Sequence, residues 1–188
     1  MKNPPLAPSA VVPLAGLVEE SVVDGSGIRC AVFVQGCPHR CKGCHNPQTH
    51  SFDGGTDTSV AELAERIAAN PLLSGVTLSG GEPFCYPEPL SVLAKDVHAH
   101  GKNVWCYTGY TYEQLLKKSA SSKKIRAFLD EIDVLIDGRF IEARRNPMLK
   151  FRGSENQRIL NLKSMRASET IEPILWNEAF IPPVNKHT

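Results

Sequence analysis

The stretch GIRCAVFVQGCPHRCKGCHNP, from Gly27 to Pro47, decides how this sequence is interpreted. Its first part, 27–35, is short, apolar and rich in β-branched residues, which predicts a buried β-strand. Its second part places Cys37, Cys41 and Cys44 in one loop with the spacing C-x3-C-x2-C. Thiolates that converge within one loop repel one another unless a cation offsets their charge. The stretch therefore predicts a strand that leads directly into a metal-binding loop.

The residues alone leave the identity of the metal open. Zinc would need four ligands, so His39, His45 or a distant cysteine would have to join the three thiols. Iron-sulfur clusters are held by thiolates, ordinarily four for a 4Fe-4S cube, so three cysteines would leave one iron open for chemistry. A disulfide scaffold is disfavoured, because six cysteines in 188 residues without a signal peptide are not typical of a secreted cystine-rich protein. Cys30 and Cys106 fall in predicted strands and are expected to be core residues, whereas Cys85 is either a buried thiol or a neighbour of the site.

Length and composition indicate a single globular domain. The chain has 188 residues, of which 41% are hydrophobic and 22% charged, which is ordinary for a folded domain. The formal net charge is +1, so no overall field would attract DNA or an anionic membrane. No apolar run approaches the roughly 18 residues that cross a membrane. We therefore expect a cytoplasmic protein with no membrane association and no nucleic-acid partner.

Both ends of the chain are expected to lie outside this domain. Four of the 14 prolines fall within the first 13 residues, where Pro8 and Pro13 interrupt an apolar stretch. We predict a flexible proline-rich leader at 1–16, a single domain at 17–166 and a C-terminal tail of unknown structure at 167–188.

Strand and helix patterns alternate along the domain. Short apolar segments predict strands, and apolar residues at i, i+3, i+4 and i+7 predict helices between them. Capping boxes are expected at Ser59 with Glu62 and at Thr111 with Gln114, and Gly101 is expected to end a helix. Crossovers of this length favour parallel strands, so the fold class is α/β, a partial (βα) barrel of parallel strands with helical crossovers. The further strands are expected at 75–79, 103–107, 134–136 and 158–162, and the helical faces at Val60, Leu63, Ala64 and Ile67, at Leu90, Leu93, Ala94 and Val97, and at Ile125, Phe128, Leu129 and Ile132.

Unusual residues follow four of the predicted strands. The cysteine loop follows the first strand, and the segments 80–82, 108–110 and 137–139 follow the next three. In parallel α/β folds the loops after the strands share one rim, which is where ligands bind. The sequence therefore predicts that these four segments converge, although a single glycine pair is more often just a tight turn.

At these motifs the chain resembles the radical S-adenosylmethionine superfamily, through C-x3-C-x2-C at Cys37, Cys41 and Cys44 and GGEP at 80–83. Within that superfamily it is similar to the activating proteins of glycyl radical enzymes. It is most similar to the family that activates anaerobic ribonucleoside-triphosphate reductase. The resemblance covers 16–162, and the leader and the tail do not take part in it. The supporting strings are VDGSGIR at 23–29, CPHRCKGCHNP at 37–47, TGY at 108–110, DVLIDGRF at 133–140 and FRGSENQRI at 151–159.

The resemblance implies a reaction and its cofactors. Cys37, Cys41 and Cys44 would bind three irons of a 4Fe-4S cluster, and the fourth iron would take the amino and carboxylate groups of S-adenosylmethionine. One electron from the cluster would cleave the sulfonium into methionine and a 5′-deoxyadenosyl radical. This radical would abstract a hydrogen atom from a glycine of a large protein substrate, the anaerobic ribonucleotide reductase. A low-potential donor such as flavodoxin would supply the electron.

The same resemblance assigns residues to the binding of S-adenosylmethionine. Gly80 and Gly81 would let the backbone approach the cofactor, and Glu82 would meet its ammonium group. Arg139 would pair with its carboxylate, because a guanidinium group matches a carboxylate in a bidentate fork. Thr108 would contact the ribose.

Three further residues of the cysteine loop are assigned to the cofactor. The superfamily often has an aromatic residue before the last cluster cysteine, and this chain has Gly43 there. Gly43 and Cys44 would lie beside the adenosyl group, and His45 offers a substitute surface for the adenine.

A local excess of positive charge follows the fourth predicted strand. Residues 139–166 contain eight basic and two acidic residues. This segment is either a solvated face or a docking surface for the partner reductase, and nucleic acid is the least favoured partner because no aromatic stacking pattern accompanies the charge. The sequence assigns no role to Arg152, Asn156, Gln157 and Arg158, although they belong to the resemblance.

Two other functions are compatible with these motifs. One is a different small radical enzyme that acts on a small molecule, similar to 7-carboxy-7-deazaguanine synthase. The other is a zinc-binding interaction module without catalytic activity. A chain this short has little room to enclose a complex small molecule, whereas a protein partner can cover an open rim.

Overall fold

The computed structural model describes residues 10–170 and residue 175. Its seven strands form one sheet in the order β3-β1-β2-β4-β5-β6-β7. The strands are β1 (Val11–Ser21), β2 (Arg29–Val34), β3 (Thr56–Ser59), β4 (Gly75–Gly80), β5 (Asn103–Tyr107), β6 (Val134–Asp137) and β7 (Arg158–Asn161). The α-helices are α1 (Val60–Ala69), α2 (Pro87–Ala99), α3 (Tyr112–Ser121), α4 (Lys123–Asp130) and α5 (Leu162–Ala167), and the short 3-10 helices are η1 (Pro47–Thr49), η2 (Pro83–Cys85) and η3 (Glu142–Arg144).

The centre of the sheet is parallel, as the alternation of strands and helices predicts. β2 pairs with β4, β4 with β5 and β5 with β6 in parallel register. The outer strands are antiparallel, because β1 pairs with both β2 and β3, and β7 pairs with β6. The α/β class and the partial barrel of parallel strands are confirmed, with antiparallel strands added on both sides.

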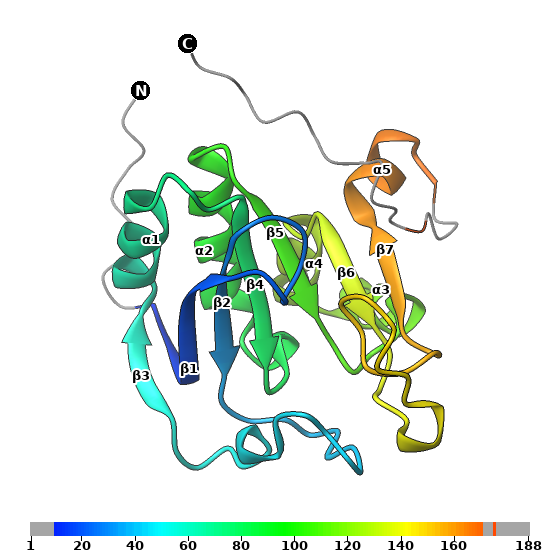
Figure 1. The fold of residues 1–188 in the computed structure, drawn as a ribbon. Helices are drawn as coiled ribbons and strands as arrows, with labels where there is room; N and C mark the ends of the chain where they lie inside the picture. The colour runs from blue at the N-terminus through cyan, green and yellow to red at the C-terminus, as the bar shows by residue number, and fades with distance from the viewer. Residues whose placement is uncertain (1–9, 171–174, 176–188) are drawn as a thin grey trace.

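Helices cover one face of this sheet (Figure 1). Residues alternate along β5: Val104 and Cys106 are buried in the large core that also contains the apolar faces of α1, α2 and α4. Trp105 points to the other face, where it packs with Val134 and Ile136 in a second cluster. Cys106 is fully buried, in agreement with its predicted place in the core.

Arg29 crosses the second face and explains part of the VDGSGIR string. Its side chain is fully buried, and its guanidinium lies 5.1 Å from the centroid of the Trp105 ring. It donates hydrogen bonds of 2.6 Å to Thr77 Oγ1 and to the carbonyl oxygen of Val76. Burial lowers the pKa of this guanidinium to about 9, with Asp133 and other neighbours opposing the shift. Arg29 therefore ties β2 to β4 and β5.

The start of the folded region lies earlier than predicted. β1 begins at Val11, inside the segment 1–16 that was expected to be a flexible leader. The prediction is wrong for residues 11–16, because Val12 and Leu14 are buried and the carbonyl oxygen of Pro13 accepts the N–H of Gln35 at 2.8 Å. The positions before residue 10 lie outside the described residues.

The two predicted capping boxes have different outcomes. Thr111 and Gln114 form one at the start of α3, where the Thr111 side chain accepts the Gln114 N–H at 3.3 Å. Ser59 makes no side-chain cap hydrogen bond. It ends β3, and the N–H of Val60, the first residue of α1, donates to the Ala10 carbonyl oxygen at 2.9 Å.

The described chain continues past the predicted domain end at 166, and Leu175 in the predicted tail forms a β-bridge with Leu160. α5 ends at Ala167, and the N–H of Thr170 donates to the Met165 carbonyl oxygen at 3.0 Å. Residues 171–174 and 176–188, most of the predicted tail, lie outside the described residues. Within the described part of the chain, none of the helices has the length and apolarity required to cross a membrane.

Candidate functional site

The four unusual segments meet at the carboxyl edge of the parallel strands, as predicted. The Glu82 N–H donates to the Gly36 carbonyl oxygen at 2.9 Å, which joins the end of β4 to the start of the cysteine loop. The Gly138 N–H donates to the Tyr110 carbonyl oxygen at 2.9 Å, which joins the ends of β6 and β5. In Figure 1 the cysteine loop and the loop between β6 and β7 both lie below this edge.

Backbone N–H groups act to lower the pKa of two thiols in the cysteine loop, and another forms a hydrogen bond to sulfur. The Asn46 N–H donates to Cys44 Sγ at 3.4 Å. Burial raises the pKa of the Cys37 and Cys41 thiols, and backbone N–H groups of His39 and Phe140, respectively, oppose these shifts. Hydrogen bonds to a sulfur favour its thiolate form, which is the form that binds metal.

The donor set fits an iron-sulfur cluster better than a single zinc ion. All six cysteines are free thiols. In the described residues, no three His, Cys, Asp or Glu side chains converge as ligands of one ion. A tetrahedral zinc site requires such convergence, whereas in a cluster each cysteine binds a different iron. His39, a fourth ligand in the zinc interpretation, is occupied, since its Nε2 lies 2.8 Å from Glu82 Oε2.

Gly80 and Gly81 are required by the packing of the chain on itself. Gly80 has a φ of 90°, and a Cβ there would lie 2.6 Å from the Phe33 Cα. A Cβ on Gly81 would lie 2.2 Å from the Gly36 carbonyl oxygen, and the Gly81 N–H donates to the Val34 carbonyl oxygen at 2.7 Å. These glycines therefore allow β4 to approach β2. This agrees with the tight-turn interpretation, which was the alternative to a contact with the cofactor.

Glu82 and Thr108, both predicted to contact the cofactor, contact each other. Glu82 is fully buried and Thr108 is buried, and the Thr108 hydroxyl lies 2.9 and 3.0 Å from the two carboxylate oxygens. Glu82 also accepts the N–H groups of Gly109 at 2.9 Å and Phe84 at 3.0 Å. A direct contact between Glu82 and an ammonium group would require one of these donors to leave.

Arg139 faces a separate part of the rim. It is exposed and lines a cavity of about 330 Å³ together with Gly109, Asp137, Asn156 and Arg158. Its charge helps to offset the effect of burial on the pKa of Cys41, so the guanidinium lies near the cysteine loop. Arg139 is therefore placed where it can reach a ligand at this edge.

Gly43 and His45 lie on the side of the loop that faces the β6–β7 connection. Gly43 has a φ of 72°, and a Cβ there would lie 3.0 Å from Glu142 Oε1. The His45 ring is exposed and packs on the Phe140 ring with centroids 5.1 Å apart. An aromatic surface thus lies beside Cys44, contributed by His45 and Phe140.

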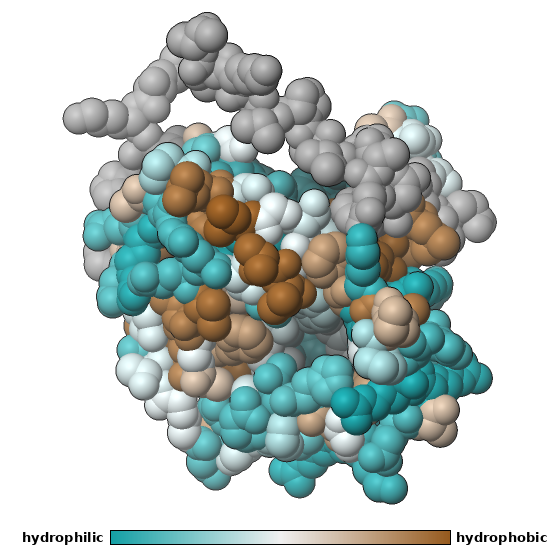
Figure 2. Space-filling view, in the orientation of Figure 1, coloured by the Kyte–Doolittle hydropathy of each residue, from teal (hydrophilic) through white to brown (hydrophobic). Residues whose placement is uncertain are grey.

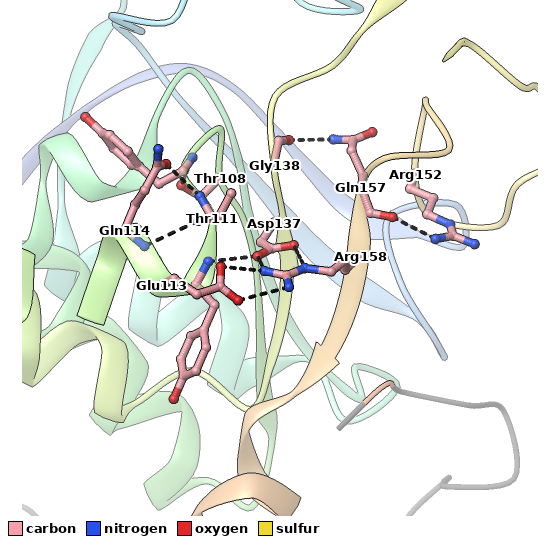
Figure 3. A network of polar contacts seen from close by, with 11 residues as sticks. Thr108, Thr111, Glu113, Gln114, Asp137, Gly138, Arg152, Gln157 and Arg158 are labelled. Carbon is pink, nitrogen blue, oxygen red and sulfur yellow. Dashed lines mark hydrogen bonds and ion pairs between the residues drawn. The ribbon is translucent and has the colours of Figure 1, made fainter. Parts of the chain in front are cut away.

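The structure supplies roles for polar residues to which the sequence assigned none. Arg158 lies between Asp137 and Glu113 and pairs with both carboxylates (Figure 3). Gln157 accepts the Gly153 N–H at 2.9 Å and donates to the Gly138 carbonyl oxygen at 3.1 Å. Because Glu113, Asp137 and Gly138 are distant in sequence from Gln157 and Arg158, only the string FRGSENQRI itself could have marked these residues.

Comparisons with known proteins find one matching family model and several similar sequences. The 4Fe-4S single cluster domain family matches residues 23–160. The chain is 39% identical over 153 residues to the anaerobic ribonucleoside-triphosphate reductase-activating protein of Haemophilus influenzae, covering 76% of this chain and 93% of that protein. It is 39% identical over 149 residues to the protein of that name from Vibrio cholerae, covering 72% and 89%. For the protein of bacteriophage T4 with the same name, the identity is 37% over 145 residues, covering 73% and 86%.

Proposed function

The chain belongs to the 4Fe-4S single cluster domain family and to the anaerobic ribonucleoside-triphosphate reductase-activating proteins, and on this premise we propose that it is a radical S-adenosylmethionine activase. It reductively cleaves S-adenosylmethionine and abstracts a hydrogen atom from a glycine of the reductase. The observation that carries this proposal is the loop that holds Cys37, Cys41 and Cys44 at the shared strand edge, where the Asn46 N–H donates to Cys44 Sγ.

The residues of the rim divide the work of binding. Cys37, Cys41 and Cys44 would each bind one iron, which would leave one iron for the amino and carboxylate groups of S-adenosylmethionine. When bound, the reduced cluster would supply the electron for cleavage of the cofactor into methionine and a 5′-deoxyadenosyl radical that can take a hydrogen atom from glycine. Arg139 holds the carboxylate of the cofactor, and its position beside the cavity supports this role.

The remaining contacts with the cofactor follow from the arrangement of the rim. The aromatic surface of His45 beside Gly43 and Cys44 supports a contact with the adenine. Gly80, Gly81 and Thr108 shape the floor of the site through their contacts with neighbouring strands and with Glu82.

The protein partners are the reductase and a low-potential electron donor such as flavodoxin. The loop between β6 and β7 meets the cysteine loop where Glu142 pairs with Lys42, and it carries the exposed Arg144 and Arg145. These two charges support docking of a protein surface with negative charge there. Free thiols at all six cysteines are consistent with action in the cytoplasm, where thiols are kept reduced.

Anaerobic incubation with the reductase tests this function. The purified protein, S-adenosylmethionine, a chemical reductant and the reductase should together give a glycine-centred doublet in the electron paramagnetic resonance spectrum. The Cys41→Ala variant should be colourless, fold normally and give neither the doublet nor 5′-deoxyadenosine, because one cluster ligand is missing.

Two other results would contradict the proposal. Catalytic turnover of a small molecule without any protein partner would favour the enzyme similar to 7-carboxy-7-deazaguanine synthase. Colourless wild-type protein that carries one zinc ion per chain would favour the interaction module.

A further inference from the structure

Within 37–44, the segment that carries the three cysteines, the deeply buried polar side chain is that of His39. This side chain is 5% exposed, and its Nε2 lies 2.8 Å from Oε2 of Glu82, whose side chain is 0% exposed. A carboxylate only accepts hydrogen bonds, so the His39 Nε2 carries the proton of this contact. Its neighbours Pro38 and Arg40 are exposed. The loop is therefore attached to the domain at a single buried point between Cys37 and Cys41.

The carboxylate of Glu82 has its accepting capacity filled by this chain. Oε1 lies 3.0 Å from the Phe84 nitrogen and 2.9 Å from the Thr108 hydroxyl. Oε2 lies 2.8 Å from His39, 3.0 Å from the Thr108 hydroxyl and 2.9 Å from the Gly109 nitrogen. A carboxylate has about four lone-pair sites, so these donors occupy it completely. Glu82 thus connects the ends of β4 and β5 to the cysteine loop.

Packing leaves the His39 ring little freedom. The ring meets Tyr110 edge-on, with centroids 4.5 Å apart and planes at 73°. A Cβ on Gly109 would lie 2.3 Å from the His39 Cδ2, so only glycine fits beside the ring. The next residue, Arg40, has a φ of 47°, a left-handed conformation that non-glycine residues adopt at a cost. The buried contact of His39 fixes the loop in this turn.

We infer that His39 is a positioning residue for the three cysteine ligands, acting through Glu82, and that Glu82 serves primarily as the acceptor for this contact. The inference rests on the proposed cluster-binding function. Holding His39 on the strand ends fixes the path of the chain from Cys37 to Cys41, so that the thiols are arranged before the cluster binds. Partners of metal ligands contribute about tenfold or more to metal affinity when they orient the ligands in this way.

The test compares His39→Ala with Lys42→Ala, a change in the same loop at a side chain that is 90% exposed. After anaerobic reconstitution, the absorbance of the cluster is followed during challenge with a chelator. His39→Ala should lose its cluster about tenfold faster than wild type, and Lys42→Ala should stay within about twofold. In the metal-free proteins, alkylation of Cys37 and Cys41, followed by peptide mass spectrometry, should accelerate several-fold in His39→Ala only.

A double variant separates positioning from a general loss of stability. If His39 acts through Glu82, combining His39→Ala with Glu82→Gln should be no worse for cluster retention than the more damaging single change, because interacting residues are not additive. Additive losses would overturn the inference.

A third variant keeps the test informative if His39→Ala does not fold, as judged by circular dichroism. His39→Gln retains a donor and should keep more of the cluster than His39→Ala, or fold where His39→Ala does not. Cluster retention and alkylation rates equal to wild type in either His39 variant would overturn the inference. A wild-type protein that binds no cluster would overturn the proposed function instead.

Discussion

At the scale of single residues, Arg158 shows how one side chain organises this rim. It pairs with Asp137, which is 1% exposed at the end of β6, and with Glu113, which is 57% exposed in the first turn of α3. The N–H of Tyr112 donates to the same Asp137 carboxylate at 2.8 Å. Arg158 therefore joins β7, β6 and α3. Its partner Asp137 lies two residues before Arg139, which lines the cavity.

This pairing predicts a dependence of stability on acid pH. Hydrogen bonds from Arg158 lower the pKa of Glu113 to about 2, although burial opposes the shift. A carboxyl group with a lowered pKa stabilises the folded state above its unfolded pKa of about 4.3, and this contribution disappears as the pH falls toward 2. Urea unfolding should therefore find Glu113→Gln less stable than wild type at pH 7, with the difference shrinking between about pH 4.3 and 2. A difference that stays constant over this range would contradict the pairing.

At the scale of elements, close approach of strand backbones decides which glycines can be replaced. Gly75 pairs with Asn103 in the parallel register of β4 and β5, and a Cβ there would lie 1.9 Å from the Asn103 carbonyl oxygen. Gly16, in the middle of β1, has nothing within 4 Å of its Cβ position. The two glycines thus lie in strands of one sheet, but only Gly16 has room for a side chain.

Alanine at these two positions should have opposite effects on the free energy of unfolding. Gly75→Ala should lose about 3 kcal/mol, because the added methyl group forces the strands apart. Gly16→Ala should be neutral or gain about 0.5 kcal/mol, because it lowers only the entropy of the unfolded chain. Midpoints of urea unfolding at neutral pH measure both. Equal losses of unfolding free energy would show that the close pairing of β4 with β5 does not decide which glycine can be replaced.

At the scale of the whole molecule, polar and apolar surfaces are separated. In Figure 2 brown surface gathers over the loop between β1 and β2, where Val22 and Val23 are 69% and 72% exposed. Hydrophilic surface dominates where the loop between β6 and β7 lies, and this loop holds Arg144 and Arg145. Gln157 and Asn156 hold that loop on the carbonyl oxygens that follow β6, at 3.1 and 2.8 Å. A surface held in place in this way loses little entropy when a partner binds.

Reversing charge on this loop should separate docking from chemistry. Replacing Arg144 and Arg145 together by Glu should lower the rate of radical formation on the reductase about tenfold at low salt, since complementary charge steers association. Cleavage of S-adenosylmethionine with dithionite, without the reductase, should stay within about twofold of wild type. Replacing Lys123 and Lys124 on α4 by Glu is the matched control, because it makes the same change of charge on another exposed surface.

Each other outcome of this comparison has a definite meaning. If only the flavodoxin-dependent rate falls while dithionite-driven activation persists, the loop binds the electron donor and the reductase docks elsewhere. If neither rate changes, the loop is simply a solvated face.

The sequence by itself determined the alternating elements, the parallel centre of the sheet and the edge at which the motifs meet. It also identified the three cysteines and the family. These signals are local, because the periodicity of strands and helices, the spacing of thiols and each short motif involve residues that are close in the chain. Only the tertiary structure decided which partners the polar groups have. His39 and Glu82 are 43 residues apart in the chain, and Pro13 belongs to a strand only because β2 and β3 flank it. Such contacts depend on how the elements pack, since burial leaves a polar group only those partners that the fold brings within reach.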